Sequence, residues 1–197
     1  SEMPNMKYLQ IFSHIITCLV EGEFMQMEDV YRIDQGIARY MTKTQKKTAD
    51  FMEGCMELGG LLGGWSEFEI VELKKYGHAL GMAFQITDDI MDYRETTETT
   101  GKPVGNDLRE GLLTYPLLSI VNDDNKDKLL ADIKALNNGG DEQAIIDYVI
   151  SQGGIDNTLA VADQYCKDAL AALDAVRDFP GKEFLVMAVE NLADRKV

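Results

Sequence analysis

Apolar residues recur every three or four positions along most of this chain, the spacing that places them on one face of an α-helix. The first such stretch spans residues 6–26. The later stretches span residues 35–62, 66–92, 117–121, 126–136, 142–150, 159–175 and 183–193. No segment of useful length alternates apolar and polar residues as a strand would. The pattern therefore predicts an all-α fold, with a turn at residues 137–140.

Several of these helices carry further local signals. The first has an apolar face made of Leu9, Phe12, Ile16, Leu19 and Val20. The second carries a later apolar stripe made of Phe51, Cys55, Leu58 and Leu62. Asp34 is the expected N-cap of the second helix, and the glycine cluster at 59–64 is expected to end it. In the third, Gly77 and Gly81 lie four residues apart and indicate close contact with a neighbouring helix.

Composition narrows the class of protein. The chain has 197 residues, of which 45% are hydrophobic, so a single domain with a substantial core is expected. A net charge of −15 argues against nucleic acid and anionic membranes as partners. No apolar run is long enough for a transmembrane segment, and no signal peptide opens the chain, which favours a cytoplasmic location. The cysteines Cys18, Cys55 and Cys166 are interpreted as reduced core residues.

The candidate chemistry lies at the end of the third helix. On a helix, Gln85, Asp88, Asp89 and Asp92 fall within one turn of each other. Two charges about 4 Å apart repel by roughly 4 kcal/mol at an effective dielectric of 20, and a hard cation such as Mg²⁺ would offset that repulsion. The alternative is a solvated acidic helix end.

A polar loop follows the aspartates. Threonine, glycine and proline end the helical periodicity at residues 95–107. We expect this loop to bring the positively charged side chain of Lys102 beside the acidic cluster. Carboxylates, a metal ion and a lysine together suit a diphosphate, whose charges must be neutralised from several sides.

Four motifs together resemble trans-polyprenyl diphosphate synthases. Residues 84–92 followed by 101–108 read F-Q-I-T-D-D-I-M-D and G-K-P-V-G-N-D-L, similar to the family's second aspartate-rich region. Residues 22–26 resemble its G-E-x-x-Q, Tyr40 with Lys47-Thr48-Ala49 its Y-x(6)-K-T-A, and residues 110–116 its E-G-K-x-T-x-P. The sequences of these motifs are most similar to those of the catalytic chain of bacterial heptaprenyl-type synthases.

The resemblance implies a fold and an activity. The fold is the isoprenoid synthase bundle of antiparallel helices around a deep pocket, and the reaction is the Mg²⁺-dependent condensation of isopentenyl diphosphate with an allylic diphosphate. It assigns metal binding to Asp88, Asp89 and Asp92, and catalytic roles to Lys47, Thr48 and Gln85. Substrate binding falls to those last three residues with Phe84 and Lys102. Lys43 and Lys46 match no motif and are interpreted as a solvated face.

Two departures from the family pattern matter. No earlier D-D-x-x-D is present, so residues 1–197 are expected to be the C-terminal portion of a single prenyltransferase domain, without its N-terminal helices and inactive by itself. Leu112 stands where many relatives have lysine. We expect the helix at 6–26 to expose an apolar face and either to self-associate or to pair with the missing N-terminal segment. The synthase itself is expected to be a homodimer or a heterodimer with another synthase subunit. A terpene cyclase and a non-catalytic regulatory subunit are the alternatives.

Overall fold

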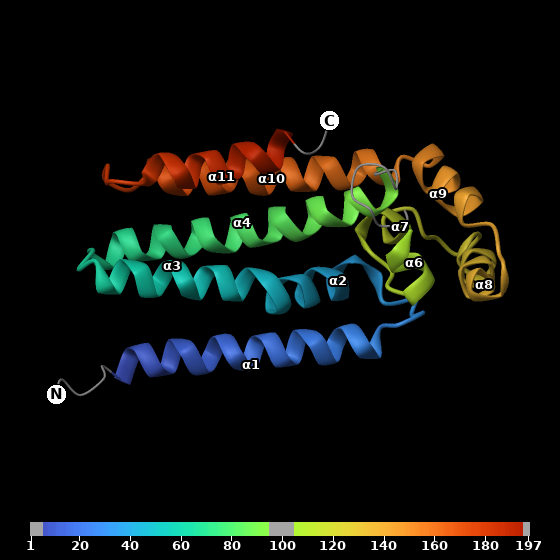
Figure 1. Ribbon diagram of the computed structural model, residues 1–197, viewed down its shortest axis with the longest axis horizontal. Coiled ribbons are helices and arrows are strands. Elements are labelled where there is room, and N and C mark those ends of the chain that lie inside the picture. The colour runs from blue at the N-terminus through green and yellow to red at the C-terminus, as the bar shows by residue number, and fades with distance from the viewer. Residues whose placement is uncertain (1–5, 95–104, 195–197) are drawn as a thin grey trace.

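The computed structural model describes residues 6–94 and 105–194, and within these ranges it contains helices and no strands. The predicted all-α class is therefore confirmed. The helices form an elongated bundle (Figure 1). They are α1 (Met6–Glu28), α2 (Gly36–Thr44), the π-helical segment η1 (Gln45–Ala49), α3 (Asp50–Leu62), α4 (Glu67–Arg94), α6 (Asn106–Glu110), α7 (Tyr115–Leu118), α8 (Lys126–Ala135), the 3₁₀ segment η2 (Leu136–Asn138), α9 (Glu142–Ser151), α10 (Gly154–Asp174) and α11 (Lys182–Asp194).

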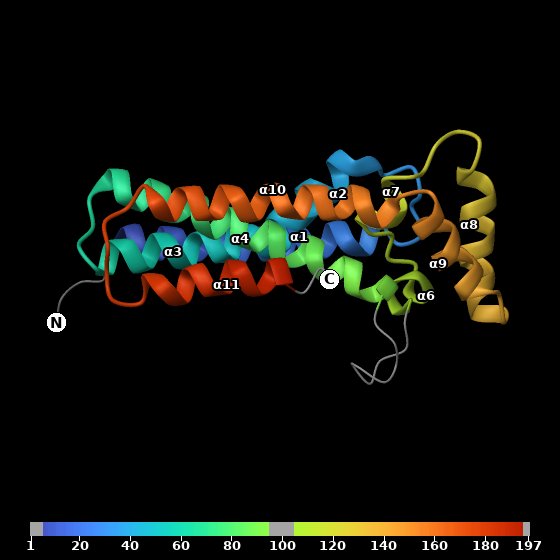
Figure 2. The same ribbon diagram turned by 90° about the horizontal axis from the view of Figure 1, so that it is seen from above.

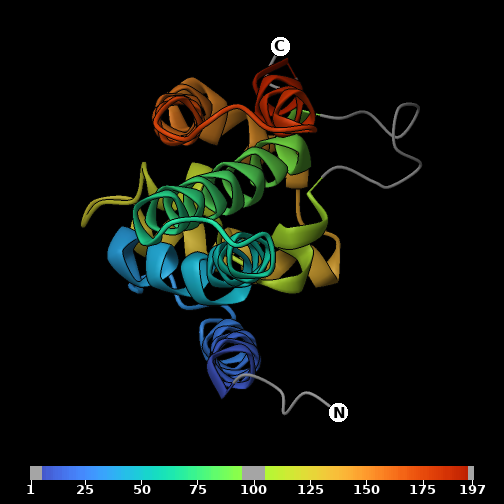
Figure 3. The ribbon, with the colours of Figure 1, turned by 90° about the vertical axis from the view of Figure 1, so that its left-hand side faces the viewer.

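Helix α4 lies at the centre of the bundle. It packs against α3 on one side and against α10 on the other, and α11 lies beside α10 (Figures 1 and 3). Helix α1 forms an outer layer that contacts η1, α3 and α2. Helices α8 and α9 lie across one end of the bundle (Figure 2). None of the described helices is long and apolar enough to cross a membrane.

Small residues bring α4 into backbone contact with η1 and α3, as the glycine spacing predicts. A Cβ atom on Gly77 would lie 2.8 Å from the Cα of Glu53, and one on Gly81 would lie 2.6 Å from the Cα of Ala49. Helix α4 begins with a capping box, in which the Ser66 hydroxyl accepts from the Glu69 amide and the Glu69 carboxylate accepts from the Ser66 amide. The start of α4 and its distance from α3 are thus both fixed locally.

The helix predicted over residues 35–62 is present but is not uniform. Its middle, η1, has the wider π-helical turn, which accommodates one extra residue and is often found at functional sites. The predicted N-cap is wrong: the Asp34 carboxylate lies 3.6 Å from the guanidinium of Arg32, and Gln35 occupies the cap position without a side-chain cap. The ion pair draws Asp34 away from the helix amides.

The apolar stripes of the first two predicted helices face outward. Leu9, Phe12, Ile16 and Val20 on α1 are exposed, as are Phe51, Cys55 and Leu62 on α3. Cys55 is therefore not a core residue, whereas Cys18 and Cys166 are buried. The faces turned inward instead carry Ile11, Ile15 and Gly54, because small residues let the helices approach closely. The expectation that residues 6–26 expose an apolar face is confirmed.

Helices α10 and α6 differ from the sequence prediction. Helix α10 starts at Gly154, five residues before the expected position, after Gly153 takes a left-handed conformation with φ of +79°. Helix α6 begins at the end of the segment expected to be loop, where no helix was predicted. Each of its flanking glycines, Gly105 and Gly111, has a positive φ, so the chain turns sharply at both ends.

Candidate functional site

All five motif segments contribute residues to the lining of one pocket of about 260 Å³. Residues from α1, α2, η1, α4, α6 and the segment after α6 line it: Gln26, Tyr40, Lys43, Thr44, Lys47, Gln85, Asp88, Asp89, Asp107, Leu112, Leu113 and Thr114. The pocket therefore combines carboxylates, two lysines and amide and hydroxyl groups from segments far apart in the sequence.

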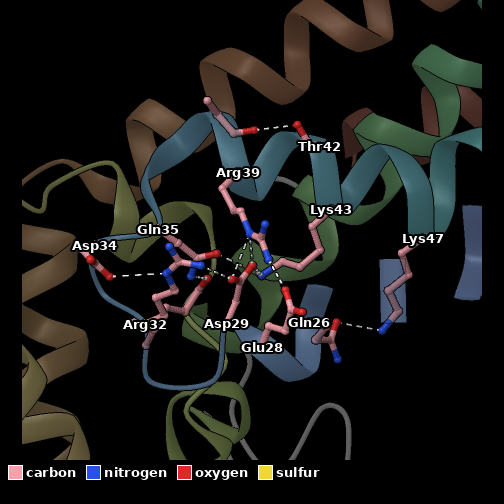
Figure 4. A network of polar contacts seen from close by, with 12 residues as sticks. Gln26, Glu28, Asp29, Arg32, Asp34, Gln35, Arg39, Thr42, Lys43 and Lys47 are labelled. Carbon is pink, nitrogen blue, oxygen red and sulfur yellow. Dashed lines mark hydrogen bonds and ion pairs between the residues drawn. The ribbon is translucent and has the colours of Figure 1, made fainter. Parts of the chain in front are cut away.

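Lys47 is held in this pocket by the G-E-F-M-Q segment of α1. Its ammonium donates to the Gln26 amide oxygen at 2.9 Å (Figure 4). The ammonium also lies 3.0 Å from a Glu23 carboxylate oxygen. The ammonium can approach because Gly22 lets α1 rest on the Lys47 backbone. The two motifs, about 20 residues apart in the sequence, thus together position the Lys47 ammonium at the pocket.

A chain of hydrogen bonds links the K-T-A motif to the aspartates. Thr48 donates to the Gln85 amide oxygen at 3.0 Å, and the Gln85 amide nitrogen donates to Asp89 at 3.2 Å. The Tyr40 hydroxyl donates to the other Asp89 oxygen. Burial raises the pKa of Asp89 to about 6, against the lowering effect of these two donors. Asp89 is therefore committed to orienting Tyr40 and Gln85.

The three predicted metal-binding carboxylates point to different partners. Asp88 is exposed at the pocket, while Asp89 is 3% exposed and turned towards Tyr40. Asp92 accepts hydrogen bonds from the backbone amides of Asn106 and Asp107 at 3.0 and 3.1 Å, and so fixes the start of α6. Among the described residues, these three carboxylates do not form a group whose ligand atoms all lie within 4.8 Å of one another.

Asp107 joins Asp88 at the pocket and was not assigned a role from the sequence. Burial and the neighbouring charges of Asp92, Asp89 and Asp88 raise the pKa of Asp107 to about 7. The donor set therefore fits a divalent cation, since the carboxylates disfavour one another's charge. Mg²⁺ commonly takes only one or two protein carboxylates and completes its shell with water and substrate phosphates.

Lys43 corrects the solvated-face interpretation. It is 8% exposed, donates to Gln35 at 3.2 Å and lies 3.6 Å from Asp29 (Figure 4). Asp29 is 1% exposed and also accepts from Arg39 at 3.0 Å. Burial lowers the pKa of Lys43, while Asp29 and then Asp89 raise it. A buried carboxylate needs cations around it, which is why Lys43 turns inward. Lys46 remains at the surface, paired with Glu21.

The other predicted site residues are less central. Phe84 is 38% exposed and does not line the pocket. Lys102 lies outside the described residues. Leu112 lines the pocket with an apolar side chain at the position where relatives carry lysine. Asp107 could have been found, because it is the aspartate of the quoted G-N-D-L sequence.

Comparison with known proteins defines the class. A model of the polyprenyl synthetase family matches residues 1–152. Heptaprenyl diphosphate synthase component 2 from Geobacillus stearothermophilus is 33% identical over 176 residues, which cover 89% of this chain and 55% of that protein. A crystal structure of a decaprenyl diphosphate synthase from Rhodobacter capsulatus superposes with a TM-score of 0.87 at 27% identity, covering 98% of this chain and 61% of that one.

A second solved structure carries ligands. It is a polyprenyl synthase from Caulobacter crescentus complexed with calcium and isoprenyl diphosphate, with a TM-score of 0.85 at 29% identity over 98% of this chain and 60% of that one. The fold is thus that of the isoprenoid synthases. The chain belongs to the polyprenyl synthetase family. It spans about half the length of the curated relatives it matches.

Proposed function

We propose that this chain supplies a diphosphate-binding site of a trans-polyprenyl diphosphate synthase, which condenses isopentenyl diphosphate with an allylic diphosphate. The observation that carries the proposal is the pocket, where Lys47, Gln85 and the carboxylates of Asp88 and Asp107 meet. Thr48 adjoins it through its hydrogen bond to Gln85. A lysine opposite carboxylates suits a diphosphate, whose oxygens take a direct cationic donor on one side and a shared divalent cation on the other.

Each pocket residue has a role that follows from its contacts. Lys47 already faces two oxygen acceptors, Glu23 and Gln26, and a diphosphate would replace or share them. Asp89 fixes the orientation of the Gln85 amide, since it accepts only from the amide nitrogen. The amide oxygen of Gln85 and the Thr48 hydroxyl oxygen therefore face each other, and together they offer negative dipoles to a developing carbocation.

The cation would be held by Asp88 and Asp107, with Asp92 fixing the segment that carries Asp107. Mg²⁺, when bound, neutralises the charge that develops on the departing diphosphate. The remaining requirement is exclusion of water from the allylic cation. Buried Leu113 and partly buried Leu112 bring apolar surface to the pocket.

The outer face of α1 supports association with another synthase chain, identical or different. It exposes a set of large apolar residues: Met6, Leu9, Phe12, Ile16, Val20, Phe24 and Met27. Apolar patches of several hundred Å² on a soluble protein usually mark an interface. Light scattering of the wild type and of Phe12→Asp tests it: a larger species that the substitution dissociates supports association, and a wild-type monomer contradicts it.

The function is tested by calorimetric titration of inorganic pyrophosphate in the presence of Mg²⁺. Lys47→Ala should weaken binding by about 10- to 100-fold, because a charge-assisted contact is lost. Lys46→Ala removes the same charge one residue away, from a surface ion pair with Glu21, and should change binding by less than about twofold. Equal losses in the two variants would contradict the assignment of Lys47.

A further inference from the structure

A second cluster of potential ligands lies on the side of α3 that faces α1, apart from the diphosphate pocket. His14 and Cys18 lie one turn apart on α1, and Asp50 starts α3 opposite them. One ligand atom from each of these three residues lies within 4.8 Å of the other two. Imidazole, thiolate and carboxylate are the donor types that Zn²⁺ takes in proteins.

We propose that His14, Cys18 and Asp50 form a site for a borderline-soft divalent metal ion, Zn²⁺ in the first instance, that clamps α1 to α3. The separation of the two α1 donors is suitable. The Cys18 sulfur lies 3.6 Å from the His14 Nε2 atom. Zn–S and Zn–N bonds of about 2.3 and 2.0–2.1 Å at tetrahedral angles put sulfur and nitrogen about 3.6 Å apart.

The site has an open side through which an ion can enter. His14, Asp50, Glu53 and Gly54 line a hollow of about 260 Å³ together with charged and polar residues of α1, α3 and α4. His14 is exposed, whereas Cys18 is 4% exposed and does not itself line the hollow. Gly54 allows the approach of α1, because a Cβ atom there would collide with the Ile15 side chain. The three donors leave a fourth position for water.

A neighbouring group that shares Asp50 is a weaker candidate. Asp50, Glu53 and His78 also lie within 4.8 Å of one another. Glu53 already has partners, however: the Lys74 ammonium lies at 3.3 Å and the His78 imidazole at 3.6 Å. A metal ion between Glu53 and His78 would have to displace the ammonium of Lys74. The thiol-containing group therefore carries the proposal.

Metal binding must overcome the free-energy cost of deprotonating the Cys18 thiol. Burial and a hydrogen bond with Asp50 raise the pKa of the Cys18 thiol to about 11 in the absence of metal. Coordination requires the thiolate, so binding releases a proton. A hard ion such as Mg²⁺ gains little from a thiolate, and the site should therefore discriminate against it. This preference for a softer metal ion distinguishes the His14–Cys18–Asp50 site from the proposed diphosphate-binding pocket, where the cation ligands are the carboxylates of Asp88 and Asp107.

The test uses Co²⁺ as a spectroscopic substitute for Zn²⁺, with Mg²⁺ in excess to occupy sites made only of oxygen. One equivalent of Co²⁺ should produce a thiolate-to-metal absorption band that Zn²⁺ abolishes. The band should be lost in Cys18→Ser and retained in Cys55→Ser, the matched change at the exposed cysteine of α3. No band, or a band that persists in Cys18→Ser, would overturn the proposal.

Histidine variants decide between the two overlapping groups. His14→Gln should weaken Co²⁺ binding by more than about tenfold, whereas His78→Gln should change it by less than about twofold. An equal or larger effect of His78→Gln would overturn the assignment. Because a bound ion stabilises only the folded chain, Zn²⁺ should also raise the Tm of the wild type and of Cys55→Ser but not that of Cys18→Ser.

Discussion

Gly22 of α1 lies directly on the backbone of Lys47, so that a Cβ atom at position 22 would be 2.7 Å from the Lys47 amide nitrogen and 2.9 Å from its Cα. The contact places the last turns of α1 beside η1. It brings Glu23 and Gln26 to the Lys47 ammonium. The glycine of the G-E-F-M-Q sequence therefore sets the position of the cation that we expect to bind diphosphate.

Gly22→Ala should destabilise the chain by about 1–3 kcal/mol, because the clash is with backbone that cannot move independently. It should also weaken pyrophosphate binding, since Lys47 shifts with η1. Thermal unfolding and calorimetry measure the two effects.

Gly59→Ala is the matched control. Gly59 also lies within a helix, but a Cβ atom there meets no atom within 4 Å. This substitution should stabilise by about 0.5–1 kcal/mol and leave binding unchanged. Comparable losses of stability at both positions would show that the contact with Lys47 is not tight.

Lys43→Ala should destabilise the folded chain, because the Lys43 ammonium belongs to a buried network of charged and polar side chains. Asp29 would keep Arg39 and Arg32 but lose Lys43, and Gln35 would lose its donor. Breaking one contact of a buried charge network costs about 1–3 kcal/mol. Denaturant unfolding should show this loss in Lys43→Ala and almost none in Lys46→Ala. Identical unfolding midpoints would contradict the buried network.

Asp107→Asn should stabilise the metal-free chain at pH 8, on the order of 1 kcal/mol. The reason is that burial and three neighbouring aspartates disfavour its charge. The same variant should gain less Tm from Mg²⁺ and pyrophosphate than the wild type does. Asp124→Asn, at an exposed position, should change neither quantity. A loss of stability in Asp107→Asn with chelator present would show that Asp107 is already paired.

Cys18 should be protected from alkylation at pH 8. Its pKa, raised from 9.0 to about 11, reduces the thiolate fraction on the order of 100-fold. The raised pKa also implies that the thiol contributes stability below pH 9, which is lost as the pH rises through about 11. Iodoacetamide with mass spectrometry should label the exposed Cys55 first. Labelling of Cys18 at the same rate in the folded chain, with metal removed, would contradict its burial.

The sequence was sufficient for the fold class and for the segments that meet at the pocket. Periodicity placed most helices within about two residues of their observed ends, because long amphipathic segments are the strongest signal in a sequence. The aspartates, Lys47, Thr48 and Gln85 were all found as motif positions.

The directions of side chains could not be derived in the same way. Asp88 and Asp89 are adjacent in the sequence, yet one is exposed and the other is buried against Tyr40, a residue 49 positions away. Lys43 turns inward because of Asp29, which lies in a different segment. The stripe of Phe51 and Leu62 faces outward because glycines and Ala49 occupy the contact with α4. Such choices depend on tertiary neighbours that no local pattern records.

The π-helical turn at Gln45–Ala49 joins α2 and α3 into one continuous helical rod, and it rotates the side chains of α3 relative to those of α2. Each residue of an α-helix adds about 100° of rotation, so the extra residue in this turn offsets everything after it by roughly that angle. Tyr40 and Lys43 can then face Asp89 and Asp29 while Gly54 faces Ile15 on α1. Deleting a single residue here would leave a continuous helix, but it would turn one half of the rod away from its neighbours.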